Sequence, residues 1–146
     1  MNLKYQELID SQKLSIQCPP AECEVNATDL QAARWVLAPI DNNLNFLPNH
    51  IYNQKKGLPL RPTMKEEVKC GYCSLSFHDS IEASIVAFRS LSPAIQEKLG
   101  YTHVAKGIIA SGWGLVTKKS DISKHFEVFE GNDKDWVSSF NIEAEL

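Results

Sequence analysis

The stretch CSLSFHDSIEASIVAF, residues 73–88, decides the fold class of this chain. Cys73 to Phe77 alternates along the chain as a half-buried strand does. Asp79 is expected to cap the helix that follows, with Glu82 three residues later as its partner in a capping box. The helix then carries apolar residues at spacings of four and three, which are Ile81, Ile85 and Phe88. A strand that leads directly into an amphipathic helix therefore lies at the centre of the sequence.

The residues after this stretch predict a second helix and then a series of strands. Ser92 is expected to cap that helix, with Pro93 in its first position and Gly100 at its end. Short runs rich in β-branched and aromatic residues follow, separated by turn residues, as strands usually are. These expected strands cover residues 101–110, 113–117 and 125–130.

The C-terminal residues predict a β-hairpin. His125 to Glu130 is its first strand, and residues 131–134 (Gly-Asn-Asp-Lys) form its turn. In the second strand, alternate residues are expected to share one face. These residues are Trp136, Ser138, Phe140, Ile142 and Ala144. We expect this face to pack in the main core against the apolar stripe of the central helix, because both surfaces need cover.

The N-terminal part predicts shorter and fewer elements. Residues 3–13 have the pattern of a short amphipathic helix. Thr28, with Gln31 three residues later, predicts the start of a second short helix that leads into a buried strand at residues 35–38. Residues 41–67 are dense in Asn and Pro, which favours turns. With helices first, strands last and no alternation of the two, the sequence predicts one α+β domain over residues 1–146, with a mostly antiparallel sheet and residues 1–27 as a peripheral segment.

Composition excludes several classes of protein. The 146 residues carry a formal charge of −3, which argues against a nucleic-acid surface over the whole domain. The chain shows neither the apolar core of a signal peptide nor a run of about 18 apolar residues that could cross a membrane. We therefore expect a cytoplasmic protein with no membrane contact. The four cysteines are then expected to be reduced or bound to metal.

The cysteines show the sharpest local pattern. Cys70-Gly71-Tyr72-Cys73 places two thiols at a spacing that can hold one zinc ion. Cys18 and Cys23 supply a second pair, so one structural zinc on all four cysteines is one hypothesis, with His78 as a substitute ligand. The simpler interpretation is a pair of ordinary half-buried thiols. A thioredoxin-like redox pair is a third, although that chemistry favours a helix start after a strand.

A second set of residues suggests an enzyme. Arg61, in an irregular loop before Pro62 and Thr63, can position a guanidinium for phosphate or carboxylate. An arginine that grips NAD beside short sheets is typical of an ADP-ribosyltransferase-like fold, in which Glu127 or Glu130 would be the catalytic carboxylate. His78 beside Asp79 could act as a general base. The alternatives are a surface arginine and an N-cap aspartate. A pocket that combines Arg61, His78 and Glu127 would support the enzyme.

From Arg34 onward the order of motifs resembles a group of small uncharacterised bacterial proteins. The motifs are Trp35-Val36-Leu37, Leu60-Arg61-Pro62-Thr63 with Lys65 and Glu66, Leu75-Ser76-Phe77-His78-Asp79, and Gly112-Trp113-Gly114-Leu115-Val116-Thr117. The resemblance implies a bacterial origin. Small proteins of this kind are often accessory parts of multi-gene systems.

The absence of familiar catalytic motifs favours a binding role. Ala110-Ser111-Gly112-Trp113-Gly114 is neither a nucleophile elbow nor a phosphate-binding loop. The late strands are rich in aromatic residues, and a two-sided hairpin needs a second layer or a partner. The leading hypothesis is therefore a non-catalytic protein–protein interaction domain, an accessory subunit of a bacterial assembly. Its expected partner-binding residues are Trp113, Phe126, Phe129 and Trp136.

Overall fold

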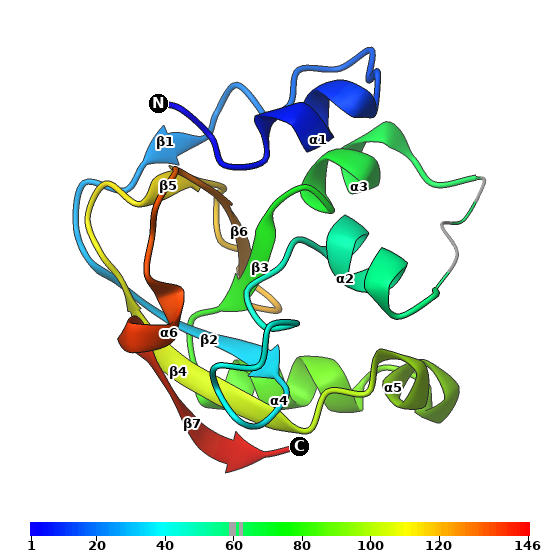
Figure 1. The fold of residues 1–146 in the computed structure, drawn as a ribbon. Helices are drawn as coiled ribbons and strands as arrows, with labels where there is room; N and C mark the ends of the chain where they lie inside the picture. Colours follow the sequence, from blue (N-terminus) through cyan, green and yellow to red (C-terminus); the bar gives the residue numbers. More distant parts are fainter. Residues whose placement is uncertain (59–60, 62) are drawn as a thin grey trace.

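A computed structural model of the chain describes residues 1–58, 61 and 63–146, and its centre is a seven-stranded sheet (Figure 1). The strands are β1 (Glu24–Val25), β2 (Leu30–Val36), β3 (Leu75–His78), β4 (His103–Ile109), β5 (Gly114–Val116), β6 (His125–Glu130) and β7 (Phe140–Glu145). Their order in the sheet is β1-β5-β6-β3-β2-β4-β7, and every neighbouring pair is antiparallel. The predicted α+β class is confirmed.

The helices are short and lie mostly on one side of the sheet (Figure 1). They are α1 (Gln6–Ser11), α2 (Asn49–Lys55), α3 (Glu66–Gly71), α4 (Ile81–Arg89), α5 (Pro93–Leu99) and α6 (Trp136–Ser139). Within the described part of the chain, none of them has the length and apolar character needed to cross a bilayer.

The sheet is continuous except at its middle. Along β2, all seven residues from Leu30 to Val36 pair with β4, and all four residues of β3 pair with β6. Between β2 and β3, which are both described in full, the only registered pair is Ala33 with His78. The two strands therefore separate beyond this pair, and the split leaves room for a cleft.

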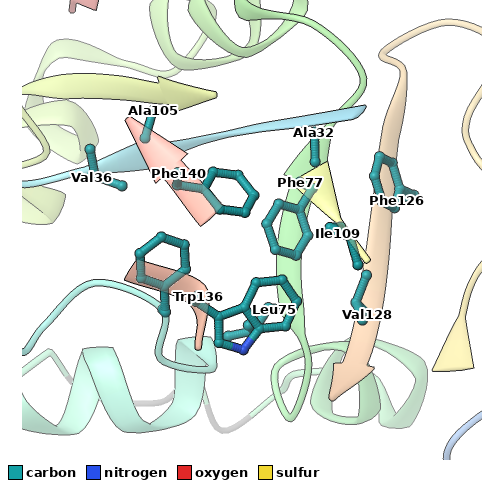
Figure 2. Packing of buried hydrophobic residues seen from close by; sticks show 11 residues of the cluster. Ala32, Val36, Leu75, Phe77, Ala105, Ile109, Phe126, Val128, Trp136 and Phe140 are labelled. Atoms are coloured by element: carbon teal, nitrogen blue, oxygen red, sulfur yellow. The ribbon is translucent and has the colours of Figure 1, made fainter. Parts of the chain in front are cut away.

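The main core lies on the inner face of the bent sheet (Figure 2). Phe77 of β3 packs beside Trp136 and Phe140, with ring centroids 5.5 and 5.8 Å away. Phe46, from the loop after β2, packs against Phe140 at 5.3 Å. Strands from both halves of the sheet contribute to this one cluster, so the sheet bends around it. The predicted placement of Trp136 and Phe140 in the main core is confirmed.

The central helix covers the opposite face of the sheet, which corrects one prediction. Phe88 of α4 packs edge-on against Trp35 of β2 at 5.2 Å, and Trp35 donates from its indole nitrogen to the carbonyl of Ser84. Side chains alternate along β2, so Trp35 points away from the face that Val36 gives to the core. The apolar stripe of α4 therefore does not meet Phe140.

Of the caps predicted for α4 and α5, one is confirmed, and the other lies one residue later than predicted. Ser92 caps α5 through the backbone amide of Ile95, and Gly100 ends that helix with a φ of 72°, as predicted. The cap of α4 is Ser80, whose hydroxyl accepts from the amide of Ala83. Asp79 instead forms an ion pair with Lys119 at 3.0 Å.

Regions rich in turn residues hold two helices that the sequence patterns did not predict. Residues 41–67, predicted as a loop, contain α2 and the start of α3. The short helix expected from Thr28 is wrong, because β2 begins at Leu30 and pairs with β4 from its first residue. Of the quoted motif around Arg61, Leu60 and Pro62 lie outside the described residues.

The C-terminal strands differ in detail from a simple hairpin. His125–Glu130 is the predicted strand, but Trp136–Ser139 is a helical turn capped by Asp135, and β7 begins only at Phe140. Strand β6 pairs with β5 and β3, whereas β7 pairs with β4 at the edge of the sheet. The helical turn carries the chain from β6, inside the sheet, to β7 at its edge.

Candidate functional site

A cleft of about 570 Å³ opens where β2 and β3 separate. Its walls come from α2, the residues that follow α2, α5 and strands β2, β3 and β6. The lining residues are Arg34, Trp35, Asn49, Asn53, Leu58, Arg61, Met64, Tyr72, Ser76, His78, Leu91, Ile95, Lys98, Leu99, Tyr101 and His125. The size suits a small-molecule ligand.

Arg34 is the least expected residue of the cleft. It lies within β2 and is only 6% exposed, with its guanidinium carbon 5.3 and 5.4 Å from the ring centroids of Phe77 and Phe46. Among the described residues its Nε and Nη1 are buried without a hydrogen-bond partner. A buried charged donor without a partner is costly and rare. Arg34 also belongs to the lining of the cleft, so its charge contributes to the electrostatic potential there.

The net charge of the cleft is positive. Arg61 and Lys98 line it together with Arg34, and no aspartate or glutamate belongs to its described lining. Burial lowers the pKa of Arg34, opposed first by Tyr101 and then by Glu130, but a guanidinium stays protonated in proteins. In a chain of net charge −3, this local excess of cations favours an anionic ligand.

Burial lowers the pKa of both histidines of the cleft, which favours their neutral forms. Burial, and then the neighbouring His125, lower the pKa of His78 to about 4. Burial also lowers the pKa of His125, opposed by Glu127. The two residues form a cross-strand pair between β3 and β6, with ring centroids 5.6 Å apart. Neutral imidazoles can donate or accept hydrogen bonds there, but they add no charge.

Aromatic and amide side chains complete the cleft. Tyr101 stacks on Tyr52 with centroids 4.7 Å apart, and the hydroxyl of Tyr52 donates to the carbonyl of Leu99. Tyr72 also lines the wall, as do the amides of Asn49 and Asn53. Ring faces and amides of this kind bind flat heterocycles by stacking and by paired hydrogen bonds.

A smaller hollow of about 310 Å³ adjoins the cleft and carries the opposite charge. It shares Asn49, Tyr72, Ser76 and His125 with the cleft. Its acidic lining residues are Glu67 and Glu127. Glu127 faces Ser76 across the β3–β6 pair and accepts a hydrogen bond of 3.0 Å from the hydroxyl of Ser74.

Sequence reasoning found part of this site. Arg61 and His78, two of the three predicted catalytic candidates, line the same cleft, and Glu127, the third, lines the adjoining hollow. Glu130, the other predicted carboxylate, is buried in the core and accepts from the indole nitrogen of Trp136 at 2.5 Å. Arg34 was not singled out, although a lone arginine inside the apolar run AARWVL is a visible signal.

The cysteines lie together, but not as four thiolates. Cys18 and Cys70 form a disulfide, whereas Cys23 and Cys73 are free. The sequence analysis expected four reduced or metal-bound cysteines, whereas two of the four are in a disulfide here. A disulfide sulfur is not a thiolate and does not act as a metal ligand of that kind. In the disulfide form no three candidate ligands among the described residues are placed to hold a metal ion.

The four aromatic residues expected to bind a partner are mostly covered by the chain itself. Phe126, Phe129 and Trp136 are 5%, 2% and 4% exposed. Trp113 is half-buried and packs edge-on against Trp136 at 5.0 Å. The bent sheet thus covers most of the hairpin face that was expected to need a second layer or a partner, and the partner-binding role of these residues stays a prediction.

Taken together, the cleft can hold an anion with a flat ring, and the hollow can present a carboxylate to the end of that ligand. No protein-family model matches the chain, and neither the curated proteins nor the solved structures contain a significant match.

Proposed function

We propose that the protein is an ADP-ribosyltransferase-like enzyme whose cleft binds a dinucleotide of the NAD type. The observation that carries the proposal is the charge of the cleft, in which Arg34, Arg61 and Lys98 meet no carboxylate among the described lining residues. Guanidinium groups bind phosphate oxygens with paired, charge-assisted hydrogen bonds. Arg34 contributes its positive charge to this cleft, although its Nε and Nη1 are covered by protein atoms.

The remaining parts of a dinucleotide also find suitable neighbours. A base or nicotinamide ring can lie against the ring of Tyr72 or Tyr101, and Asn49 and Asn53 can bond its polar edge. The adjoining hollow then lies beside the ribose and offers the carboxylate of Glu127. Cations and aromatic rings in the cleft, with a carboxylate in the hollow that shares four residues with it, are the groups that such a substrate requires.

The reaction breaks the bond between the nicotinamide nitrogen and C1′ of the ribose. The bonding electron pair leaves with nicotinamide, which loses its positive charge, while positive charge develops on the ribose. The carboxylate of Glu127 stabilises that charge. It also accepts the proton from the attacking hydroxyl or amine as the new bond to C1′ forms. Water as the acceptor gives ADP-ribose.

Calorimetric titration of the full chain tests the binding step. NAD and ADP-ribose should bind, and adenosine, which lacks phosphate, should bind at least about tenfold more weakly. Arg61→Ala should weaken ADP-ribose binding by about tenfold, since it removes a charge-assisted contact from an exposed side chain. Arg89→Ala is the matched control, because Arg89 is exposed and does not line the cleft.

Release of nicotinamide tests the chemical step. Glu127→Gln should keep the affinity for NAD and slow the release of nicotinamide by about 100-fold or more. If the wild type binds NAD but releases no nicotinamide, with or without small acceptors, the proposal that the protein is an enzyme is wrong. Equal affinities for ADP-ribose and adenosine, or no binding of either, would overturn the cleft as a phosphate site.

The interaction-domain hypothesis stays a prediction. Three of its four aromatic residues are buried, so a partner would have to use other surfaces. The edge strands β1 and β7 each have one side on which no other described strand pairs. Co-purification of a protein partner that an edge-strand variant abolishes would favour that function.

A further inference from the structure

The fold brings two separate cysteine pairs into one place. Cys18 and Cys23 lie before β1, and Cys70 and Cys73 lie around the end of α3, with 52 residues separating Cys70 from Cys18. All four belong to one small apolar cluster with Leu3, Ile9 and Phe129. The Cys18–Cys70 disulfide, with Cα atoms 5.7 Å apart, shows that the two pairs are in direct contact.

Each pair sits on a tight turn, as metal-binding pairs do. Cys70 is in the last turn of α3, and the amide of Cys73 donates to the carbonyl of Cys70 at 3.0 Å. In the other segment the amide of Cys23 donates to the carbonyl of Pro20 at 3.1 Å, so the chain doubles back between Cys18 and Cys23. Two turns that each offer a pair of sulfurs can surround one tetrahedral ion.

The disulfide form leaves two of the four sulfurs unused. Cys73 is 1% exposed, and the only described polar contact of its thiol is the carbonyl of Lys69 at 3.5 Å. Cys23 is half-buried and free. The segment around them has little regular structure, with β1 two residues long and α1 six. Such a segment gains most from a crosslink that uses all four residues.

We propose that in the reduced chain Cys18, Cys23, Cys70 and Cys73 bind one zinc ion, which replaces the Cys18–Cys70 disulfide as the crosslink between the N-terminal segment and α3. A dithiol opens the disulfide by giving up two electrons and two protons. A phosphine gives up two electrons, and water supplies the two protons and the oxygen of the phosphine oxide. Four thiols then bind Zn²⁺ and release four protons. A two-electron oxidant forms the disulfide again from Cys18 and Cys70, which releases the zinc ion, and the other two thiolates take up protons.

The position of this crosslink connects it to the cleft wall. Gly71 and Tyr72 stand between the two cysteines of the second pair, and both line the hollow beside the cleft. The carbonyl of Tyr72 also accepts from the amide of His50 in α2 at 3.0 Å. Either crosslink therefore holds the turn that positions Tyr72.

Metal analysis of the reduced full chain is the experiment. Chain reduced with a phosphine, incubated with Zn²⁺ and desalted should retain about one zinc, and Co²⁺ in its place should show the thiolate-to-metal absorption of a tetrahedral four-sulfur site. Bound zinc should protect all four thiols from alkylation.

Cys23→Ser is the decisive variant, because it leaves the Cys18–Cys70 disulfide intact. Its fold is checked by circular dichroism in the oxidised form. After reduction this variant should retain far less zinc than the wild type and lose the four-sulfur cobalt spectrum. Reduced wild-type chain that retains no zinc, with all four thiols open to alkylation, would overturn the proposal. Cobalt binding without the thiolate absorption, or an unchanged zinc content in Cys23→Ser, would overturn it equally.

Discussion

Replacing Arg34 by methionine should stabilise the free protein and abolish ligand binding. Two nitrogens of the buried guanidinium lack partners among the described residues, and each such group costs about 1–3 kcal/mol. The contacts with Phe46 and Phe77 return about 0.5–2 kcal/mol each. Methionine has a similar length, packs well on aromatic rings and carries no charge.

The balance favours Arg34→Met by about 1–2 kcal/mol in the free protein. For a domain of this size that corresponds to a rise in Tm of about 2–8 °C. The assay is thermal unfolding of wild type and variant, each with and without ADP-ribose. ADP-ribose should raise the Tm of the wild type and leave that of Arg34→Met unchanged, because binding to the folded state alone stabilises it.

Two comparisons make this result decisive. Arg89→Met replaces an exposed arginine and should change the free energy of unfolding by no more than about 0.5 kcal/mol. A free Arg34→Met protein that melts well below the wild type would show that the guanidinium already has its partners. The interpretation of Arg34 as an open anion site would then be refuted.

Three further predictions concern the core, the histidines and the hollow. Phe140→Ala should lower the free energy of unfolding by about 3–5 kcal/mol in denaturant titrations, because Phe140 is 1% exposed in the main core. Val137→Ala, at a 39% exposed position, should cost about 1 kcal/mol or less, and equal losses would contradict this account of the core. The pKa of His78 is about 4 in the folded chain, below its usual 6.5, so the unfolded chain alone takes up a proton between these values. Stability should therefore fall as the pH drops from 6.5 to 4, and His78→Gln should flatten that dependence; an unchanged slope would argue against a buried neutral imidazole. A Cβ on Gly71 would lie 2.8 Å from both carboxylate oxygens of Glu127. Gly71→Ala should therefore displace this carboxylate and slow nicotinamide release, with little change in NAD affinity. An equal loss of release rate and of affinity would show a wider disturbance of the site.

Local signals in the sequence predicted those helices and strands whose ends are marked by capping or turn residues. Helix α5 begins at a serine cap with proline behind it and ends at a glycine with positive φ, so its bounds follow from the residues alone. Strand β6 was predicted with the right bounds because a turn cluster follows it. The cap of α4 moved by one residue because Asp79 found a partner in Lys119, which is distant in sequence.

Long-range pairing decided the elements that sequence patterns missed. The residues after Thr28 form a strand because β4 pairs with all of β2. The alternation from Trp136 onward predicted a strand, but Trp136–Ser139 forms a helical turn, which Asp135 caps by accepting from the amide of Ser138. Nothing local shows that the sheet bends around one core, and this bend is what covers the late aromatic residues.

The candidate site was found in part for the same reason. Arg61, His78 and Glu127 are residue types that chemistry singles out wherever they occur, and the fold places them around one continuous depression. Arg34 lines a cleft only because β2 and β3 separate, and no local sequence pattern predicts that separation. The contact between two distant cysteine pairs likewise depends on the path of the chain.

Nuclear magnetic resonance of the arginine side chains tests the central claim most directly. The arginines of the chain are Arg34, Arg61 and Arg89, so single substitutions assign each Nε–Hε signal. On titration with ADP-ribose the signal of Arg34 should shift strongly, that of Arg61 should shift as well, and that of Arg89 should stay in place. Adenosine should leave the signal of Arg34 nearly unmoved. An Arg34 signal that does not respond to ADP-ribose would contradict the account of this cleft as a diphosphate site.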